Sequence, residues 1–198
     1  MATMRSATLM SSWTQRASSY VVEAAHVLGR RFSHTSKKYV RNLPPRNYLQ
    51  IRDVETVYAV AAFEGSPNLG VFSVDITGGT AWATQMFVMR HIRDDGQQPR
   101  SLPLYLFEQG MHNHWFQGEI IKVCKMMSDQ LSIGKPDIIK EIFIWRPIDA
   151  AAVPVPSKAY AGIGSRELRP EAIKAMKDLF ARIGDFEKQV VTKHLSLQ

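Results

Sequence analysis

The chain has little of what marks a disulfide-stabilised or membrane-embedded protein. Its 198 residues contain one cysteine, Cys124, which excludes an internal disulfide and fits a reducing compartment. Because it lies in an apolar stretch, we expect Cys124 to be a small core residue. No apolar run approaches the roughly 20 residues that a membrane-spanning helix needs, so no membrane span is expected.

Several catalytic signatures are missing as well. The sequence has no phosphate-loop lysine motif, no Ser-His-Asp order that fits a triad and no defensible pair of catalytic carboxylates. His112 and His114 could grip a metal in an extended segment, but the sequence offers no matching pair of ligands elsewhere. We therefore expect no metal and no cofactor, and we interpret residues 112–115 as a loop.

What is present is the composition of an ordinary globular domain, with 45% hydrophobic and 22% charged residues. The net charge is +7, and it is unevenly placed. Residues 1–39 hold six Lys or Arg and one acid, a net charge of +5. The remainder is nearly neutral, which does not favour a nucleic-acid partner.

The basic N-terminal segment, residues 1–39, permits two interpretations. Residues 1–32 are rich in Ser and Arg, the composition of a mitochondrial transit peptide with a processing site near Ser33. The alternative is a helix over 18–31 whose apolar stripe packs on the domain. That stripe comprises Tyr20, Val21, Ala24, Val27 and Leu28. The first interpretation places the protein in the mitochondrial matrix, and the second places it in the cytoplasm.

Strand and helix patterns alternate after residue 40. Near-continuous apolar runs are typical of strands buried on both faces of a parallel sheet. We expect such strands at 57–63, 71–76, 102–107, 138–145 and 159–163, and helices at 80–92 and 170–183. Two prolines predict a rigid turn at 43–47.

This alternation predicts an α/β fold, a Rossmann-like and mostly parallel sheet with flanking helices. We assign residues 40–186 to the domain and 187–198 to a tail. In such sheets ligands bind at the carboxyl ends of strands, near a topological switch point.

The segment Thr77-Gly-Gly-Thr80 lies where a strand is expected to end and a helix to begin. Gly78 and Gly79 would let a phosphate approach the backbone, and the helix that starts at Thr80 would present N–H groups and a positive dipole end. A plain tight turn is the competing interpretation.

A second glycine segment, Gly162-Ile-Gly-Ser-Arg166, also follows an expected strand. Glycines, a hydroxyl and an arginine would suit a ribose or a phosphate. The competing interpretation makes Ser165 an N-terminal cap and leaves Arg166 in solvent. If both glycine segments end neighbouring strands, they could share one ligand site.

The order of three segments resembles the SLOG superfamily, which contains the LOG cytokinin-activating phosphoribohydrolases and the DNA-processing protein A family. The segments are Leu43–Gln50, Val57–Phe63 and Thr77–Gln85. The likeness is closer to uncharacterised phage and bacterial SLOG proteins, and it extends to Leu106–Gln109 and Gly162–Glu167. It covers roughly residues 40–183.

This resemblance implies that the glycine loop cradles the phosphate of a nucleotide-like molecule. The residues it assigns to the ligand are Arg46, Asn47, Gly78, Gly79, Thr80, Trp82, Gln85, Gly162, Gly164, Ser165 and Arg166. Gln85 stands where LOG enzymes have a catalytic glutamate, and an amide cannot act as a base. The Gly-Ser-Arg strand opens SLOG domains but lies near the C-terminus here, which implies a circularly arranged or incomplete domain.

Three functions are compatible with these patterns. The first is a domain that binds or senses a nucleotide or nucleotide-derived ligand. The second is a phosphoribohydrolase-like N-glycosidase in which Glu108 or Glu167 replaces the missing acid. The third is a non-catalytic accessory subunit of a mitochondrial complex. Because SLOG relatives are often dimers, we also expect a homo-oligomer.

Overall fold

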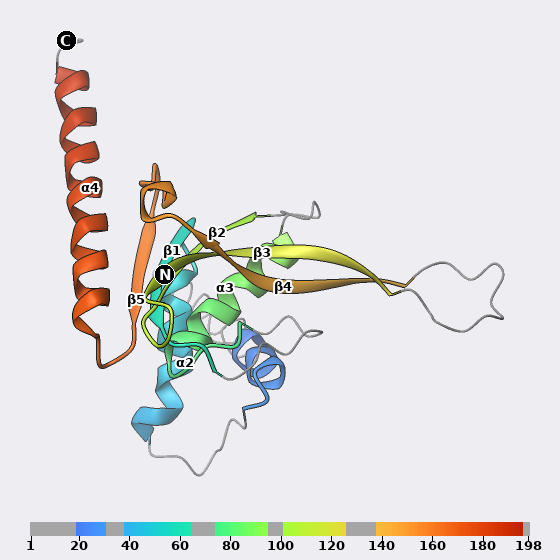
Figure 1. Cartoon of the computed structure of the whole chain (residues 1–198). Coiled ribbons are helices and arrows are strands. Elements are labelled where there is room, and N and C mark those ends of the chain that lie inside the picture. Colours follow the sequence, from blue (N-terminus) through green and yellow to red (C-terminus); the bar gives the residue numbers. More distant parts are fainter. Residues whose placement is uncertain (1–18, 31–37, 65–73, 95–100, 126–137, 196–198) are drawn as a thin grey trace, which may run out of the picture.

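A computed structural model of the chain describes residues 19–30, 38–64, 74–94, 101–125 and 138–195. Its centre is a five-stranded sheet in the order β4-β3-β2-β1-β5 (Figure 1). The strands are β1 (Thr56–Ala61), β2 (Ser101–Glu108), β3 (His114–Lys125), β4 (Ile138–Ile148) and β5 (Tyr160–Gly164).

Four of the five strands run in the same direction. β1 pairs in parallel with both β2 and β5, β3 is antiparallel to β2, and β4 is antiparallel to β3. The fold is therefore α/β, with a Rossmann-like and mostly parallel sheet, which confirms the expected fold class.

Helices cover both faces of the sheet, and β1 is buried between them. Val57 and Ala59 pack in a cluster with α3 (Thr80–Asp94), α2 (Lys38–Ile51) and a helix at 19–27. Tyr58 and Val60 point to the other face and pack with α4 (Pro170–Leu195). Because side chains alternate along a strand, α3 and α4 must lie on opposite faces.

Residues 112–115 are not a loop throughout, because β3 begins at His114. β3 and β4 form a long antiparallel hairpin with a continuous register from Trp115↔Ile148 to Lys125↔Ile138. The hairpin projects away from the side of the molecule that carries α4 (Figure 1). Cys124 lies in β3, but its side chain is outside the described part of the structure, so the prediction that it is a core residue is not tested.

Pro44 and Pro45 lie inside α2 (Lys38–Ile51), so the rigid turn expected at these prolines is wrong. Proline cannot donate to the helical ladder, but its fixed φ is compatible with helical geometry. The chain after the prolines stays helical because Tyr48 is buried and stacks on Tyr20, with ring centroids 5.2 Å apart. Packing therefore outweighs the local cost of the prolines.

The strand expected at 71–76 is not part of the sheet. Its first three residues lie outside the described part of the chain, and Ile76 makes one isolated antiparallel bridge to Phe63. The carbonyl oxygen of Val74 accepts a hydrogen bond from Trp145 Nε1 at 2.7 Å. The side chain of Gln85 accepts from the N–H of the same residue, so the backbone groups of Val74 bind side chains and do not pair with a strand.

The helix at 19–27 is part of the domain core. Val21 and Ala24 are buried in the cluster that contains α3. Cleavage near Ser33, a residue outside the described ranges, would remove these side chains from the core. At the other end of the chain, α4 continues to Leu195, well into the segment assigned to a tail. Among the described residues, no helix is long and apolar enough to cross a membrane.

Candidate functional site

The carboxyl ends of β1 and β5 lie side by side. The N–H of Ser165 donates to the carbonyl oxygen of Val60 at 3.1 Å, which continues the pairing of the two strands. The N–H of Thr77 donates to the carbonyl oxygen of Ala62 at 2.9 Å, which brings the Gly-Gly-Thr segment to the same edge. We call residues 77–80 and 164–166 the switch-point edge, because the helices that follow them pack on opposite faces.

The Gly-Gly-Thr segment forms a tight turn into α3. Gly78 has a φ of +73°, a left-handed conformation that favours glycine. The carbonyl oxygen of Gly79 accepts hydrogen bonds from Asn47 Nδ2 at 3.0 Å and from the N–H of Trp82 at 3.2 Å. Thr80 is the first residue of α3 and only 2% exposed, and its hydroxyl oxygen has no hydrogen-bond partner among the described residues.

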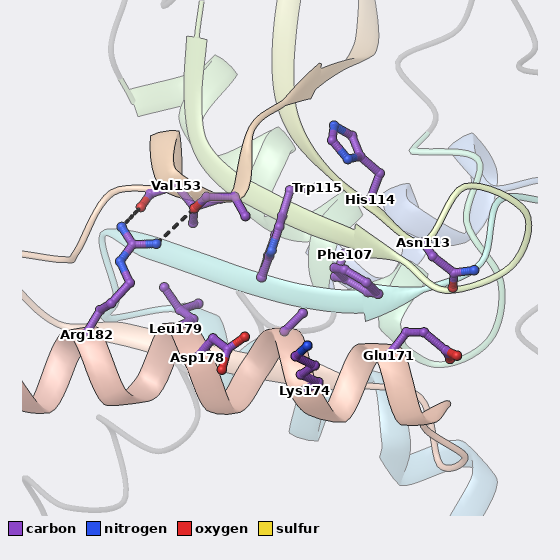
Figure 2. Close-up of a pocket in the computed structure, with 12 residues that line it drawn as sticks. Phe107, Asn113, His114, Trp115, Val153, Glu171, Lys174, Asp178, Leu179 and Arg182 are labelled. Carbon is purple, nitrogen blue, oxygen red and sulfur yellow. Dashed lines mark hydrogen bonds between the residues drawn. The ribbon is translucent and has the colours of Figure 1, made fainter.

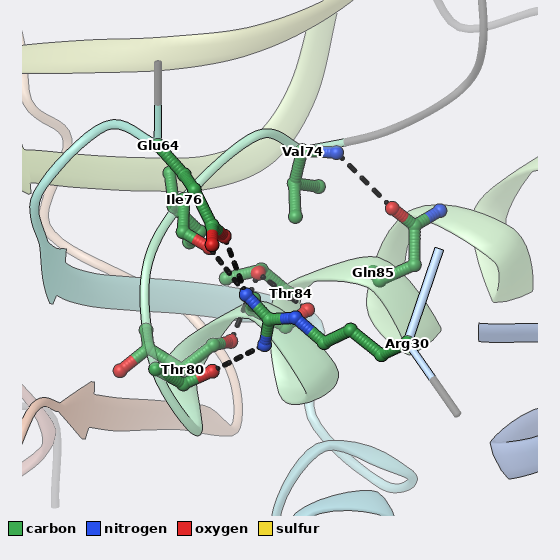
Figure 3. A network of polar contacts seen from close by, with 9 residues as sticks. Arg30, Glu64, Val74, Ile76, Thr80, Thr84 and Gln85 are labelled. Carbon is green, nitrogen blue, oxygen red and sulfur yellow. Dashed lines mark hydrogen bonds and ion pairs between the residues drawn. The ribbon is translucent and has the colours of Figure 1, made fainter. Parts of the chain in front are cut away.

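The side chain of Arg30 holds this turn, although Arg30 precedes residue 40, where the sequence predicts that the domain begins. Its guanidinium donates to the carbonyl oxygens of Gly78 at 2.7 Å and Ile76 at 3.2 Å (Figure 3). It also forms an ion pair with Glu64 at 2.6 Å. Sequence reasoning missed this role, because no local motif links Arg30 to residue 78.

The other ligand-binding residues predicted near this turn differ in their exposure to solvent. Arg46 is exposed on α2, next to the Asn47 that holds Gly79. Gln85 is fully buried, and its side-chain oxygen accepts a hydrogen bond from the N–H of Val74 at 3.1 Å (Figure 3). Trp82 is partly buried and packs against the core cluster.

The second glycine segment is tied to the end of β2 by Gln109. The side-chain amide of Gln109 donates to Ser165 Oγ at 2.8 Å and to the carbonyl oxygen of Glu167 at 3.0 Å. Its oxygen accepts from the N–H of Arg169 at 3.1 Å. Gly162, Gly164 and Arg166 are exposed. Gln109 therefore sets the position of the loop between β5 and α4, a role that sequence reasoning did not assign.

Glu108 is buried at the end of β2 and bound by backbone N–H groups. Its Oε1 accepts from Gly110 at 2.5 Å, and its Oε2 accepts from Met111 at 3.0 Å and His112 at 2.7 Å. A longer bond of 3.4 Å reaches Oε1 from the N–H of Phe63. The carboxylate thus closes the turn between β2 and β3.

Glu167, the other candidate acid, is exposed in the loop before α4. Its backbone carbonyl oxygen accepts from both Gln109 and Ser165 Oγ, the latter at 2.9 Å. The side chains of the two candidate acids therefore have different environments, one enclosed by its own turn and one in solvent.

A cavity of about 290 Å³ lies on the other face of the sheet from α3, between α4 and the sheet (Figure 2). Phe107 and Trp115 extend into it from the sheet, and Glu171, Lys174 and Asp178 line it from the helix. Its far end is closed by Arg182, whose guanidinium donates to the carbonyl oxygens of Ala150 and Val153 at 2.9 and 2.5 Å. Among the described residues, no group of three or more His, Cys, Asp or Glu side chains could hold a metal ion.

The chain matches none of the protein families, curated proteins or solved structures with which it was compared.

Proposed function

We propose that the switch-point edge binds the phosphate and ribose of a nucleotide or nucleotide-derived ligand. The observation that carries this proposal is that two glycine segments meet at the carboxyl ends of adjacent parallel strands. Residues 164–166 follow β5, and the N–H of Thr77 binds the carbonyl oxygen of Ala62, next to the end of β1. The helices after these segments cover opposite faces. Open α/β sheets bind their ligands at such a position.

The contacts of the Gly-Gly-Thr turn favour an anion. Arg30 and Asn47 both bind carbonyl oxygens, so neither occupies a backbone N–H donor of the turn. The positive end of the α3 dipole lies there. The buried Thr80 hydroxyl without a partner is also a group for which a bound water or ligand is expected.

Exposed cations are available on both sides of this edge. Arg46 is exposed on α2, one residue before the Asn47 that binds Gly79, and Arg166 is exposed just after the end of β5. A guanidinium binds phosphate with paired, charge-assisted hydrogen bonds. Asn47 is the better placed of the two amides for a ribose hydroxyl, because Gln85 faces the interior.

Two observations favour binding over hydrolysis of an N-glycosidic bond. The Glu108 carboxylate already accepts hydrogen bonds from several backbone N–H groups, which leaves it little capacity to act on a substrate. At the position of the LOG glutamate, Gln85 is a buried amide. Glu167 is the one candidate acid that solvent reaches.

A thermal-shift panel tests the proposal. The ligands are AMP, other nucleoside monophosphates, NAD, ADP-ribose and cyclic nucleotides, each added to the wild type, Arg46→Ala and the control Arg52→Ala. A ligand at 100 times its dissociation constant adds about 2.7 kcal/mol, which for this size of chain raises Tm by about 5–10 °C. We expect Arg46→Ala to lose most of the shift and Arg52→Ala to keep it. A panel without any shift for the folded wild type would contradict the proposal.

A further inference from the structure

The cavity between α4 and the sheet has an apolar interior. Phe107 and Trp115 are opposite each other on β2 and β3, and their rings meet edge to face with centroids 5.5 Å apart. Leu179 lines the cavity from α4, and Val153 lines it from the connector that follows β4. Its volume of about 290 Å³ is at the lower end of the range for small-molecule sites. The cavity therefore suits a ligand no larger than an amino acid.

The indole N–H of Trp115 is a donor that the fold leaves unused. Trp115 is only 3% exposed, and Figure 2 shows its side chain extending from β3 toward α4. In the described part of the chain its Nε1 has no acceptor, whereas Trp145 Nε1 donates to the carbonyl oxygen of Val74 at 2.7 Å. Thr80 Oγ1 is the one fully enclosed side-chain polar atom without a partner among the described residues, so the indole N–H of Trp115 remains open to the cavity. A donor in such a position is expected to bind an acceptor.

Three charged side chains border the cavity along one side of α4. Glu171, Lys174 and Asp178 line it at successive helical turns, and their charges alternate in sign. Their spacing along the helix would allow ion pairs between neighbours. None of the three forms an ion pair with any other residue that the structure describes. All three charges are therefore available to a ligand.

The wall opposite these charges is fixed before any ligand binds. Arg182 donates to the carbonyl oxygens of Ala150 and Val153, which holds the connector against α4. The hydroxyl of Tyr58 donates to the carbonyl oxygen of Pro154 at 2.7 Å and holds the same connector to the sheet. A preformed wall lowers the entropy cost of binding. Because its guanidinium is already bound, Arg182 is not counted among the groups that recognise the ligand.

The signs of the charges select one class of ligand. A simple carboxylate would bind Lys174 and the Trp115 N–H but would face two acidic side chains, Glu171 and Asp178. A simple amine would bind an acid but would leave Lys174 and the indole N–H without a partner. A molecule that carries an ammonium and a carboxylate side by side satisfies both signs at once.

We propose that this cavity binds a free amino acid with an apolar side chain, in its zwitterionic form. Lys174 and the indole N–H of Trp115 bind the carboxylate, and Asp178 binds the ammonium group. The apolar side chain packs against Phe107 and Leu179. The cavity lies on the face of the sheet opposite α3, so this inference does not rest on the proposed nucleotide site.

Isothermal titration calorimetry of the full chain, without nucleotide, tests the ligand class. The probes are L-phenylalanine and L-leucine at millimolar concentration. We expect at least one of them to bind with one-to-one stoichiometry. 2-Phenylethylamine lacks the carboxylate and 3-phenylpropanoate lacks the ammonium group, so each should bind about tenfold or more weakly than L-phenylalanine. Folded wild type that binds neither amino acid would overturn the inference, and so would equal binding of either analogue.

Substitutions on α4 test the residues assigned to the ligand. Asp178→Asn and Lys174→Gln should each weaken binding of the amino acid about tenfold, because each removes one charged partner. The matched controls are Asp53→Asn and Lys177→Gln, at exposed positions that do not line the cavity, and both should bind like the wild type. All four side chains are exposed, and circular dichroism verifies that each variant is folded. Unchanged affinity in folded Asp178→Asn and Lys174→Gln would contradict the assignment.

The indole N–H signals give a readout that needs no change on α4. The chain has four tryptophans, and the ¹H–¹⁵N spectrum of Trp115→Phe identifies the Trp115 signal by its loss. In the wild type this signal should shift and saturate at the same amino-acid concentrations as the calorimetric titration. The Trp145 signal should stay in place, because its N–H is bound to Val74. A bound amino acid that leaves the Trp115 signal unchanged would place the ligand elsewhere and overturn the inference.

Discussion

The guanidinium of Arg30 donates a 2.7 Å hydrogen bond to the carbonyl oxygen of Gly78, 48 residues further along the chain. This contact joins the N-terminal helical segment to the turn at the start of α3. The same side chain binds Ile76 and Glu64, so one residue contacts both the turn and the segment that follows β1. Because the bonds use the carbonyl side of the turn, they fix its shape without blocking its N–H donors.

Replacement of Arg30 by alanine should therefore loosen the turn. The two carbonyl bonds from a charged donor are expected to contribute about 1–3 kcal/mol together, while the exposed pair with Glu64 adds little. Thermal melts should show a decrease in Tm of several degrees. Arg146→Ala is the control, because Arg146 makes a surface ion pair with Glu119, and its Tm should change by less. Equal Tm values for the two variants would show that Arg30 does not hold the turn.

Replacement of Gln85 by glutamate distinguishes the proposed ligand-binding function from the N-glycosidase alternative. The side chain is fully buried, so a carboxylate there would be desolvated and its neutral form favoured in the folded state. Its pKa would then exceed the unfolded value, and its stability contribution would be present at low pH and lost as the pH rises. We expect Gln85→Glu to lower Tm more at pH 8 than at pH 5, with no free base released from AMP by chromatography. Base release by the variant would instead favour the N-glycosidase alternative.

Replacement of Glu108 by glutamine should open the turn between β2 and β3. The amide nitrogen would meet N–H donors that now bind a carboxylate oxygen, at a cost of about 2–4 kcal/mol. Hydrogen exchange measures this directly: the amides of Met111 and His112 should exchange faster in Glu108→Gln than in the wild type. Glu119→Gln, which alters the ion pair with Arg146 in the middle of β3, should leave their exchange unchanged. If these two amides exchange at the same rate in Glu108→Gln as in the wild type, the carboxylate does not hold this turn.

Because the phenol of Tyr58 is buried, we expect the free energy of unfolding to decrease in alkaline solution. Its hydroxyl donates to the carbonyl oxygen of Pro154 at 2.7 Å, and burial raises the pKa of this phenol well above its ordinary value. The folded state then keeps its proton after the unfolded state has released it, so stability is full below about pH 10 and falls above it. Urea titrations at pH 8 and 10.5 should show a larger decrease in unfolding free energy for the wild type than for Tyr58→Phe. Equal decreases would contradict this assignment.

The α/β fold was predictable because its parallel strands are nearly continuous apolar runs. β1, β2 and β5 were all expected within a few residues of their observed bounds, as were the starts of α3 and α4. The β3 strand was missed because Gly118 interrupts its pattern. That glycine is explained only by tertiary structure, since a Cβ at this position would come within 2.9 Å of the Phe143 ring.

The candidate site was predictable only in part. Its glycines and Arg166 are visible in short motifs, and the pairing of β1 with β5 brings the two motifs to one edge. Arg30 and Gln109 act through contacts with residues that lie far away in sequence, so no local pattern identifies them. The burial of Gln85 likewise depends on how Val74 folds back over α3.

The most direct test of the nucleotide site is a ¹H–¹⁵N NMR titration of the full chain with whichever nucleotide gives the largest thermal shift. If the switch-point edge binds it, the amide signals of Gly78, Gly79, Thr80, Gly164 and Ser165 should shift together and saturate at one ligand concentration. Shifts confined to Phe107, Trp115 and Leu179 would place the ligand in the cavity under α4 and contradict the account. A spectrum that no nucleotide changes would contradict it equally.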